Sequence, residues 1–291
     1  MHVMLDIFSG RPNPTWEVPP TVARHVRSLI ARQGGPASAG PRPALGYRGL
    51  LVATGPEDAE VPMAFHIGGP PPVTKAAIET VTPPHVVPHD EREAALTLLE
   101  SARPVIERKV IDAAAQAVEA RPEAVLHAAR ATAAEAAEIA PVSVDAPCEP
   151  ILAPYRPWFW NADPIRLRNN CYNYASNYVS NFVAQPGRRT GHFYDAFTCE
   201  GIAKAAIADG YREECDGPAR VVALAVWPGY DFHWYRSHGD FWAHKLGIYS
   251  ARNVDNLGRV ITGPLTPATC DRGPYIQFCR YMFVPPGVEV L

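Results

Sequence analysis

Residues 230–247, Tyr-Asp-Phe-His-Trp-Tyr-Arg-Ser-His-Gly-Asp-Phe-Trp-Ala-His-Lys-Leu-Gly, decide the fold prediction for the second half of the chain. Aromatic residues occur on both arms of this stretch and a glycine lies between them, which is the pattern of a β-hairpin. Strands over 231–236 and 241–245 would place His233 directly opposite His244, with Cβ atoms about 4.5–5.5 Å apart. The stretch therefore predicts two imidazoles side by side on one face of a sheet.

Composition limits the class of protein. The chain has 291 residues, of which 47% are hydrophobic and 20% charged, which is typical of a globular protein with a substantial core. A formal charge of −3 gives no electrostatic reason to expect nucleic acid or a membrane surface as a partner. No apolar run approaches the length that spans a bilayer, and the N-terminus lacks the features of a secretory signal. These observations predict a cytoplasmic protein, with export by a route without an N-terminal signal left open.

Proline-rich and alanine-rich segments divide the chain. Residues 1–140 are expected to form a smaller α/β-type domain of unknown role, with Ala-rich helices in 90–140. Residues 141–157 contain five prolines and predict an extended linker. Aromatic residues gather in 158–291, where helices followed by an antiparallel run of strands indicate an α+β domain.

Hydrophobic spacing and turn residues predict the elements of both domains. In the first domain they predict strands over 2–8, 47–53 and 61–67 and helices over 20–33, 91–101, 105–120 and 122–139. In the second they predict helices over 170–184 and 199–209 and strands over 219–227, 231–236, 241–245, 258–262 and 275–284.

Six cysteines are present, without a Cys-x-x-Cys pair and without zinc-finger spacing. An even number of cysteines in a chain this long, without a secretion signal, is weak support for disulfides. We therefore expect four or five of the six to be buried thiols.

Cys171 lies at the start of a predicted helix, after Asn170, which suits an N-cap. Unpaired backbone N–H groups in a first helical turn lower the pKa of a thiol, which is what a nucleophilic cysteine requires. The alternative is a buried structural cysteine in an amphipathic helix. Cys199 is a second candidate, although the neighbouring Glu200 would oppose formation of the thiolate.

The order of these motifs resembles the NlpC/P60 group of papain-like cysteine hydrolases, over about residues 165–250. Members carry a cysteine at a helix start, a second helix, a strand, and then strands that bear the base and an orienting residue. The resemblance implies a papain-like frame in which Cys171 is the nucleophile, His233 the general base and His244 the residue that orients it. This chain has Asn-Asn-Cys-Tyr where the family commonly has Asp-Cys-Ser, which weakens the assignment of a substrate.

The implied activity is that of a thiol protease, amidase or acyl transferase acting on a peptide or amide substrate, with no cofactor and no metal. Asp231 and Asn170 are expected to support the site, and Asp255 is a candidate third catalytic member that is otherwise a hairpin-turn residue. The N-terminal domain would recognise the substrate or a protein partner.

Two other functions are compatible with the same residues. The first is a non-catalytic binding or accessory protein on a papain-like frame, as one partner in a biosynthetic, toxin–immunity or assembly complex. The second is a metal site made by Cys171, His233 and His244, which are residue types that bind zinc.

Overall fold

The computed structural model describes residues 1–36, 44–54, 64–69, 87–120 and 150–291. The described residues fall into two compact units. The first unit contains 1–7 and 13–120, and the second contains 8–12 and 150–291. A short N-terminal segment, Phe8–Pro12, thus belongs with the C-terminal half of the chain.

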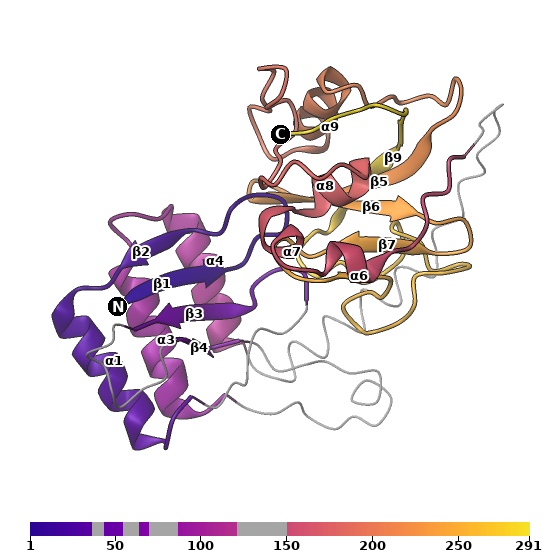
Figure 1. The fold of residues 1–291 in the computed structure, drawn as a ribbon. Coiled ribbons are helices and arrows are strands. Elements are labelled where there is room, and N and C mark those ends of the chain that lie inside the picture. The colour runs from indigo at the N-terminus through magenta and orange to yellow at the C-terminus, as the bar shows by residue number, and fades with distance from the viewer. Residues whose placement is uncertain (37–43, 55–63, 70–86, 121–149) are drawn as a thin grey trace. The chain divides into compact units, whose positions relative to one another are not determined.

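The first unit is an antiparallel sheet with helices (Figure 1). The strand order is β2-β1-β3-β4, with bounds β1 His2–Asp6, β2 Thr15–Glu17, β3 Gly49–Ala53 and β4 Ala64–Ile67. Its helices are α1 Pro20–Arg32, α3 His89–Ser101 and α4 Arg108–Glu119. Val26, Leu29 and Ile30 of α1 are fully buried, as their helical spacing predicts.

The second unit has a five-stranded antiparallel sheet in the order β8-β7-β6-β5-β9 (Figure 1). Its strands are β5 Arg220–Trp227, β6 Asp231–Ser237, β7 Trp242–Lys245, β8 Ala251–Arg252 and β9 Gln277–Val284. Its helices are α6 Pro157–Trp160, α7 Ile165–Arg168, α8 Cys171–Ser176 and α9 Cys199–Ala208. The prediction of mixed α and β structure with antiparallel sheets is confirmed.

One face of the second sheet packs on α8 and α9. Alternate strand residues supply this helix-facing core, because successive side chains in a strand point to opposite faces. The strand residues of the core are Val222, Leu224, Val226, Phe232, Trp234, Met282 and Val284. The helices contribute Cys171, Tyr172, Ala175, Ile202, Ala203 and Ala206. Each fully buried large apolar side chain stabilises the fold by roughly 1.5–3 kcal/mol, so this layer fixes how α8 lies on the sheet.

The hairpin of β6 and β7 forms with a register different from the predicted one. Tyr235, not His233, lies opposite His244, and Ser237 pairs with Trp242. The shift is two residues, so His233 and His244 still share a face of the sheet. A four-residue loop, 238–241, joins the strands, and the His238 amide donates to the Phe241 carbonyl over 2.9 Å.

Two element predictions are wrong. Helix α8 ends at Ser176 instead of continuing to residue 184, because Asn177 adopts a left-handed conformation with φ 56° that closes the helix. No continuous strand covers 258–262, where the described chain makes only the isolated bridges Val254↔Val260 and Phe241↔Thr262. The helix predicted over 122–139 lies outside the described residues.

The predicted domain boundary also lies mostly outside them, so the division into 1–140, a linker over 141–157 and 158–291 stays a prediction. Across the described ranges, no helix has the length and apolar character needed to cross a membrane.

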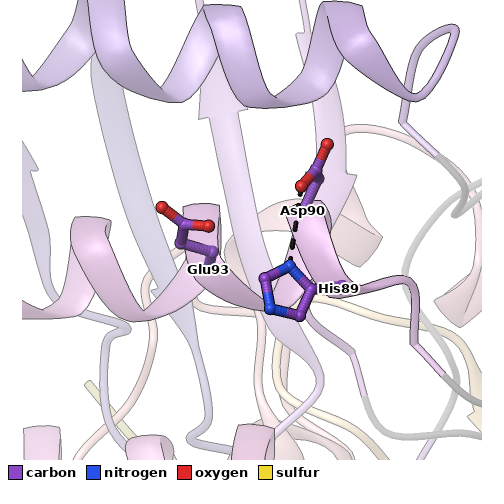
Figure 2. A group of neighbouring side chains, drawn as sticks. All are labelled: His89, Asp90 and Glu93. Atoms are coloured by element: carbon purple, nitrogen blue, oxygen red, sulfur yellow. Dashed lines mark ion pairs between the residues drawn. The ribbon is translucent and has the colours of Figure 1, made fainter.

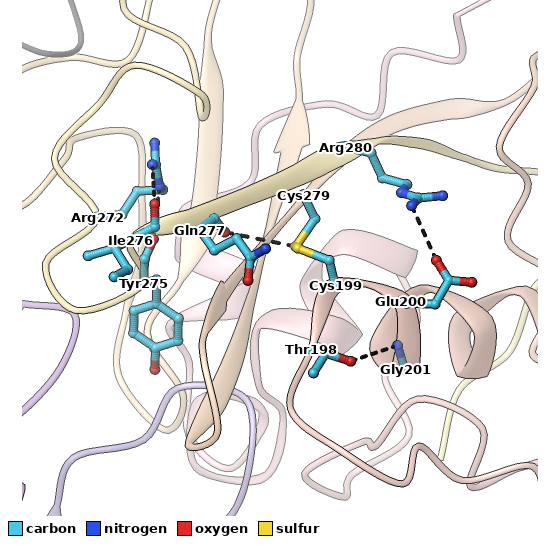
Figure 3. The surroundings of a disulfide bond; sticks show 10 residues. All are labelled: Thr198, Cys199, Glu200, Gly201, Arg272, Tyr275, Ile276, Gln277, Cys279 and Arg280. Atoms are coloured by element: carbon cyan, nitrogen blue, oxygen red, sulfur yellow. Dashed lines mark hydrogen bonds and ion pairs between the residues drawn. A yellow bond between two sulfur atoms is a disulfide. The ribbon is translucent and has the colours of Figure 1, made fainter.

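The expectation of mostly free thiols is wrong. Cys199 and Cys279 form a disulfide that ties the start of α9 to β9, 80 residues further along the chain (Figure 3). Cys215 is also disulfide-bonded. Cys171 and Cys270 are the free cysteines of the described part, and both are buried. Sequence spacing could not identify the Cys199–Cys279 pair, because tertiary packing brings these two sulfur atoms together.

Candidate functional site

Asp231, the first residue of β6, binds the N-terminal segment Phe8–Pro12. Its carboxylate accepts hydrogen bonds from the amides of Ser9 (2.7 Å), Gly10 (3.0 Å) and Arg11 (3.0 Å). The Tyr275 hydroxyl donates a fourth over 2.5 Å. Asp231 is fully buried. Burial raises the pKa of this carboxyl, and the hydrogen bonds from Tyr275, Gly10 and Ser9 oppose the increase.

Gly10 allows the close approach of this segment. A Cβ at this position would lie 2.4 Å from the Phe232 carbonyl oxygen, so only glycine fits without a backbone shift. The Gly10 carbonyl accepts hydrogen bonds from the side-chain amides of Asn170 and Gln185. Every polar backbone group of Gly10 is therefore bonded to a side chain of the second unit.

Asn170 caps α8, as predicted. Its side-chain oxygen accepts from the amides of Tyr172 (3.1 Å) and Asn173 (3.2 Å). The Asn173 side chain accepts from the Asn170 amide over 2.9 Å, which completes a capping box. Asn170 thus joins the start of α8 to the N-terminal segment.

Cys171, the predicted nucleophile, is buried in the helix-facing core with no exposed surface. Burial raises the pKa of the thiol well above its ordinary value, and the charge of Asp231 adds to the increase. Backbone N–H groups and the charge of Lys245 offset only part of it. The first turn of α8 therefore does not provide a reactive thiolate at neutral pH.

The two predicted imidazoles are hydrogen-bonded to each other. His233 Nε2 lies 2.8 Å from His244 Nδ1, and His244 Nε2 lies 2.9 Å from the Val254 carbonyl. Because a carbonyl only accepts, His244 carries its proton on Nε2 when neutral, and His233 Nε2 then donates to His244 Nδ1. Burial, followed by the charge of Arg252, lowers the pKa of His244 to about 3.

The thiol and the imidazoles are not paired. Trp234 points into the helix-facing core that contains Cys171, so its neighbour His233 points to the other face of the sheet. His233 and His244 are fully buried on that opposite face, beside Tyr235. The hydrogen bonds of the described residues include none between the Cys171 thiol and either imidazole.

The same geometry argues against the alternative of a zinc site made by Cys171, His233 and His244. Three ligands must converge on one ion, whereas these side chains project from opposite faces of a sheet. Within the described part of the chain, one group of residues has ligand atoms close enough to surround an ion, and it lies in the first unit.

That group consists of His89, Asp90 and Glu93 on α3 (Figure 2). Asp90 is already paired with Arg32 at 3.3 Å, and Glu93 with His25 at 3.4 Å. The His89 side chain is 86% exposed. Asp90 is therefore already paired with a guanidinium and Glu93 lies beside an imidazole, and the group has the character of an ordinary charged helix face.

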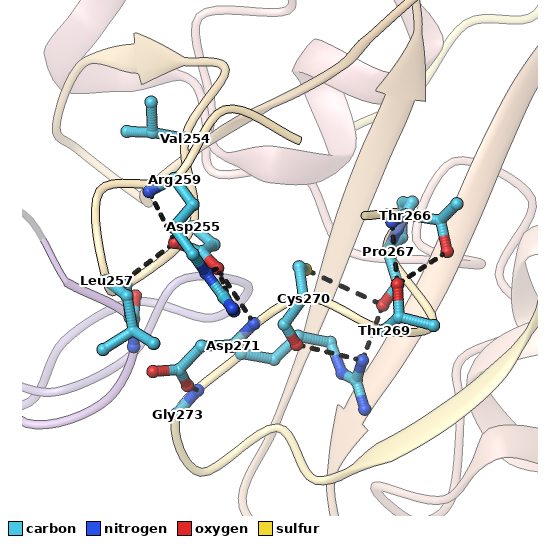
Figure 4. Close-up of polar contacts among 12 residues, drawn as sticks. Val254, Asp255, Leu257, Arg259, Thr266, Pro267, Thr269, Cys270, Asp271 and Gly273 are labelled. Carbon is cyan, nitrogen blue, oxygen red and sulfur yellow. Dashed lines mark hydrogen bonds and ion pairs between the residues drawn. The ribbon is translucent and has the colours of Figure 1, made fainter. Parts of the chain in front are cut away.

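Asp255, the candidate third catalytic residue, stabilises a turn. Its carboxylate accepts from the amides of Leu257 (3.0 Å), Arg259 (2.9 Å) and Asp271 (3.2 Å), and it pairs with the Arg259 guanidinium at 2.7 Å (Figure 4). The group that orients His244 is the carbonyl of the preceding residue, Val254.

Sequence reasoning missed Cys270, the second free thiol. Its sulfur lies 4.0 Å from the hydroxyl of Tyr235, on the face of the sheet that carries the imidazoles. Burial raises the pKa of Cys270 to about 12. This thiol is thus unreactive at neutral pH as well.

Lys245 is another buried polar residue that the sequence did not identify. Its ammonium donates to the backbone carbonyls of Arg166 (2.7 Å), Asn169 and Gly247. Burial lowers its pKa to about 7. Lys245 fastens the segment between α7 and α8 to β7, which is a structural role.

Comparison with known proteins gives one informative match. The chain is similar to insoluble matrix shell protein 1 of Ruditapes philippinarum, with 42% identity over 140 residues. These residues are 47% of this chain and 93% of that protein. No family model matches the chain, and no solved structure matches it.

This match overturns the resemblance to NlpC/P60 hydrolases and the function drawn from it. The expected assignment as a hydrolase, thiol protease or amidase is wrong, because the relative carries the name of a shell matrix protein. The papain-like frame has no support among solved structures. The burial of Cys171 gives a physical reason for the error, since a cysteine at a helix start is reactive only where its thiolate can form.

The replacement Asp231→Asn tests the structural role of the carboxylate. The new amide group would turn one acceptor into a donor that faces other donors, so we expect the free energy of unfolding to fall by about 3 kcal/mol. Tyr275→Phe removes one of four donors and should cost about 1–2 kcal/mol. Urea unfolding measures both changes. Asp216→Asn at an exposed side chain is the control, and equal midpoints for Asp231→Asn and wild type would refute the role.

Buried neutral histidines predict loss of stability in acid. Since the pKa of folded His244 is about 3 against an ordinary 6.5, the unfolded chain binds a proton in this interval that the folded chain does not. Its stabilising contribution is complete above pH 6.5 and declines as the pH falls toward 3. The variant His244→Gln should reduce the slope of stability against pH by up to about 1.4 kcal/mol per pH unit.

Urea unfolding between pH 7.5 and 4.5 measures this slope. His192→Gln, which alters an exposed histidine, is the matched control. If His244→Gln and wild type lose stability in parallel over this range, His244 is not held neutral by burial.

Proposed function

This chain belongs to the family of insoluble matrix shell protein 1, and we propose that it is a non-catalytic structural protein of an insoluble matrix outside the cell. The observation that carries the proposal is the extent of the match. The relative is 42% identical, and this chain covers 93% of its length, so nearly all of the shell protein has a counterpart here.

The state of the cysteines supports a role without catalysis. Both free thiols of the described part are buried, and burial holds their pKa values far above neutral pH. His233 and His244 are likewise sealed from solvent and bond to each other. Reactive residue types are present, but a dissolved substrate has no access to them.

The disulfides support a location outside the cell. Cys199 is bonded to Cys279, and Cys215 is also oxidised. Such bonds persist in oxidising surroundings and are rare in the cytosol. The prediction of a cytoplasmic protein rested on composition and the N-terminus, and the proposal replaces it with an extracellular location.

The disulfide between Cys199 and Cys279 also suits a durable material. It closes a loop between residues 80 positions apart, and in the chain-entropy account such a crosslink stabilises a fold by about 4 kcal/mol. It joins the start of α9 to β9, which is one of the two edge strands of the five-stranded sheet (Figure 3).

Fractionation of the native source tests the proposal. An antibody against the full chain should detect it in the extracellular insoluble material, with release by denaturant and reductant together. A cytosolic enzyme followed through the same steps controls for lysis. Recovery of the chain in the soluble cytosolic fraction would overturn the proposal.

The non-catalytic part of the proposal has its own readout. Iodoacetamide at pH 7 should leave Cys171 and Cys270 unmodified in the folded protein and modify both after unfolding in urea. Rapid labelling of Cys171 alone in the folded protein would restore the possibility of a nucleophile and contradict the proposed role.

A further inference from the structure

Two arginines lie together at the end of the helix-facing side of the five-stranded sheet. Arg236 of β6 pairs in register with Val222 of β5, and Arg220 lies two residues before Val222. Residues two apart in a strand share a face, so Arg220 and Arg236 are diagonal neighbours, with Cα atoms about 7–8 Å apart in an ordinary antiparallel pair.

Arg236 is completely buried, and one edge of its guanidinium is bonded. Nη1 donates to the Tyr174 carbonyl (2.7 Å) and to the Asn177 side-chain oxygen (2.9 Å), at the end of α8. The guanidinium also lies over the Tyr174 ring, with its carbon 4.1 Å from the ring centre. These contacts fix the orientation of the group but supply no negative charge.

The other edge of the Arg236 guanidinium is unused. Nε and Nη2 are buried and have no hydrogen-bond partner in the part of the chain that the structure describes. These two nitrogens form the side of the guanidinium that binds two oxygens of one carboxylate or phosphate with parallel hydrogen bonds. The orphaned atoms are thus the two that recognise an oxyanion.

Arg220 adds a second positive charge from a half-buried position nearer the solvent. Its Nε is also buried without a partner, and Arg220 makes no ion pair with the described residues. Among the described residues, the ionisable groups that act on the pair include Tyr174, Tyr211 and His238, and burial lowers the pKa of each arginine. The causes of these two shifts include no carboxylate of the described residues.

Without an anion, the placement of these two guanidinium groups is energetically unfavourable. A guanidinium remains charged in proteins, and a buried charge without a counter-ion is costly. Two such charges side by side also repel each other. An anion between them would remove both costs, because it neutralises the pair and accepts the unused N–H groups.

We propose that Arg220 and Arg236 bind a small oxyanion at the end of the β5–β6 pair. Arg236 would donate hydrogen bonds from Nε and Nη2 to two oxygens of the anion, and Arg220 would bind the anion from the solvent side. Because both nitrogens are enclosed, the side chains around them must move apart to admit the ion, which restricts the ligand to a compact one such as phosphate, sulfate or bicarbonate. This inference does not depend on the proposed matrix role.

Calorimetric titration of the purified full chain with sodium phosphate tests the site, with chloride holding the ionic strength constant. We expect saturable binding of one ion per chain, and sulfate and bicarbonate titrated separately show which oxyanion binds best. Arg220→Gln should weaken binding at least tenfold. Arg280→Gln, which removes an exposed arginine of β9 paired with Glu200 and Glu213, should leave it unchanged.

Arg236→Lys keeps the charge but removes the two-pronged edge, and it should also weaken phosphate binding at least tenfold if the variant folds. If it does not fold, Arg220→Gln decides the matter, because that side chain is half-exposed. The proposal is overturned if none of the three ions binds saturably. It is also overturned if Arg220→Gln binds as tightly as wild type, or if Arg280→Gln loses binding to the same extent.

Discussion

The second unit depends on a buried carboxylate whose oxygen atoms must accept hydrogen bonds from the protein. Asp231 has no exposed surface, and an unpaired carboxylate in such a place would cost several kcal/mol. Its acceptors are taken by three successive amides of the N-terminal segment and by the Tyr275 hydroxyl. The start of β6, the segment before β9 and the beginning of the chain are thereby held at one point. The cap of α8 joins the same arrangement through Asn170 and the Gly10 carbonyl.

This network explains why residues that look catalytic in the sequence are enclosed in the protein interior. Cys171 begins a capped helix, as many reactive cysteines do. This helix packs on Trp234 and its neighbours, and the packing buries the thiol completely. The imidazoles lie on the other face of the sheet, where they are hydrogen-bonded to each other and His244 is also bonded to the Val254 carbonyl. Buried polar networks of this kind can specify a unique packing when every member is bonded. The match to a shell matrix protein agrees with a chain whose reactive groups are enclosed.

Local sequence patterns predicted the local structure well. The apolar spacing of α1 and the caps of α8 and α9 follow from short-range rules and appear where those rules place them. The hairpin was also predicted, but its register was wrong by two residues, because aromatic residues on both arms allow more than one pairing. Asn177 ended α8 early through a backbone conformation that the helical spacing around it did not reveal.

The features that the sequence did not predict depend on contacts between residues far apart in the chain. The partner of Asp231 lies more than 200 residues away, at Ser9–Arg11, and a single sequence offers no sign of that pairing. The disulfide between Cys199 and Cys279 joins elements that become neighbours only when β9 completes the sheet. The separation of Cys171 from His233 likewise follows from which face α8 covers, and spacing along the chain does not contain that information.

Hydrogen exchange followed by NMR or mass spectrometry tests the central claim most directly. If the Asp231 carboxylate holds the N-terminal segment, the amides of Ser9, Gly10 and Arg11 should exchange as slowly as those in the middle of β6, and their protection should fall selectively in Asp231→Asn. Exchange of these three amides at the rate of an unstructured peptide in the wild-type protein would contradict the account.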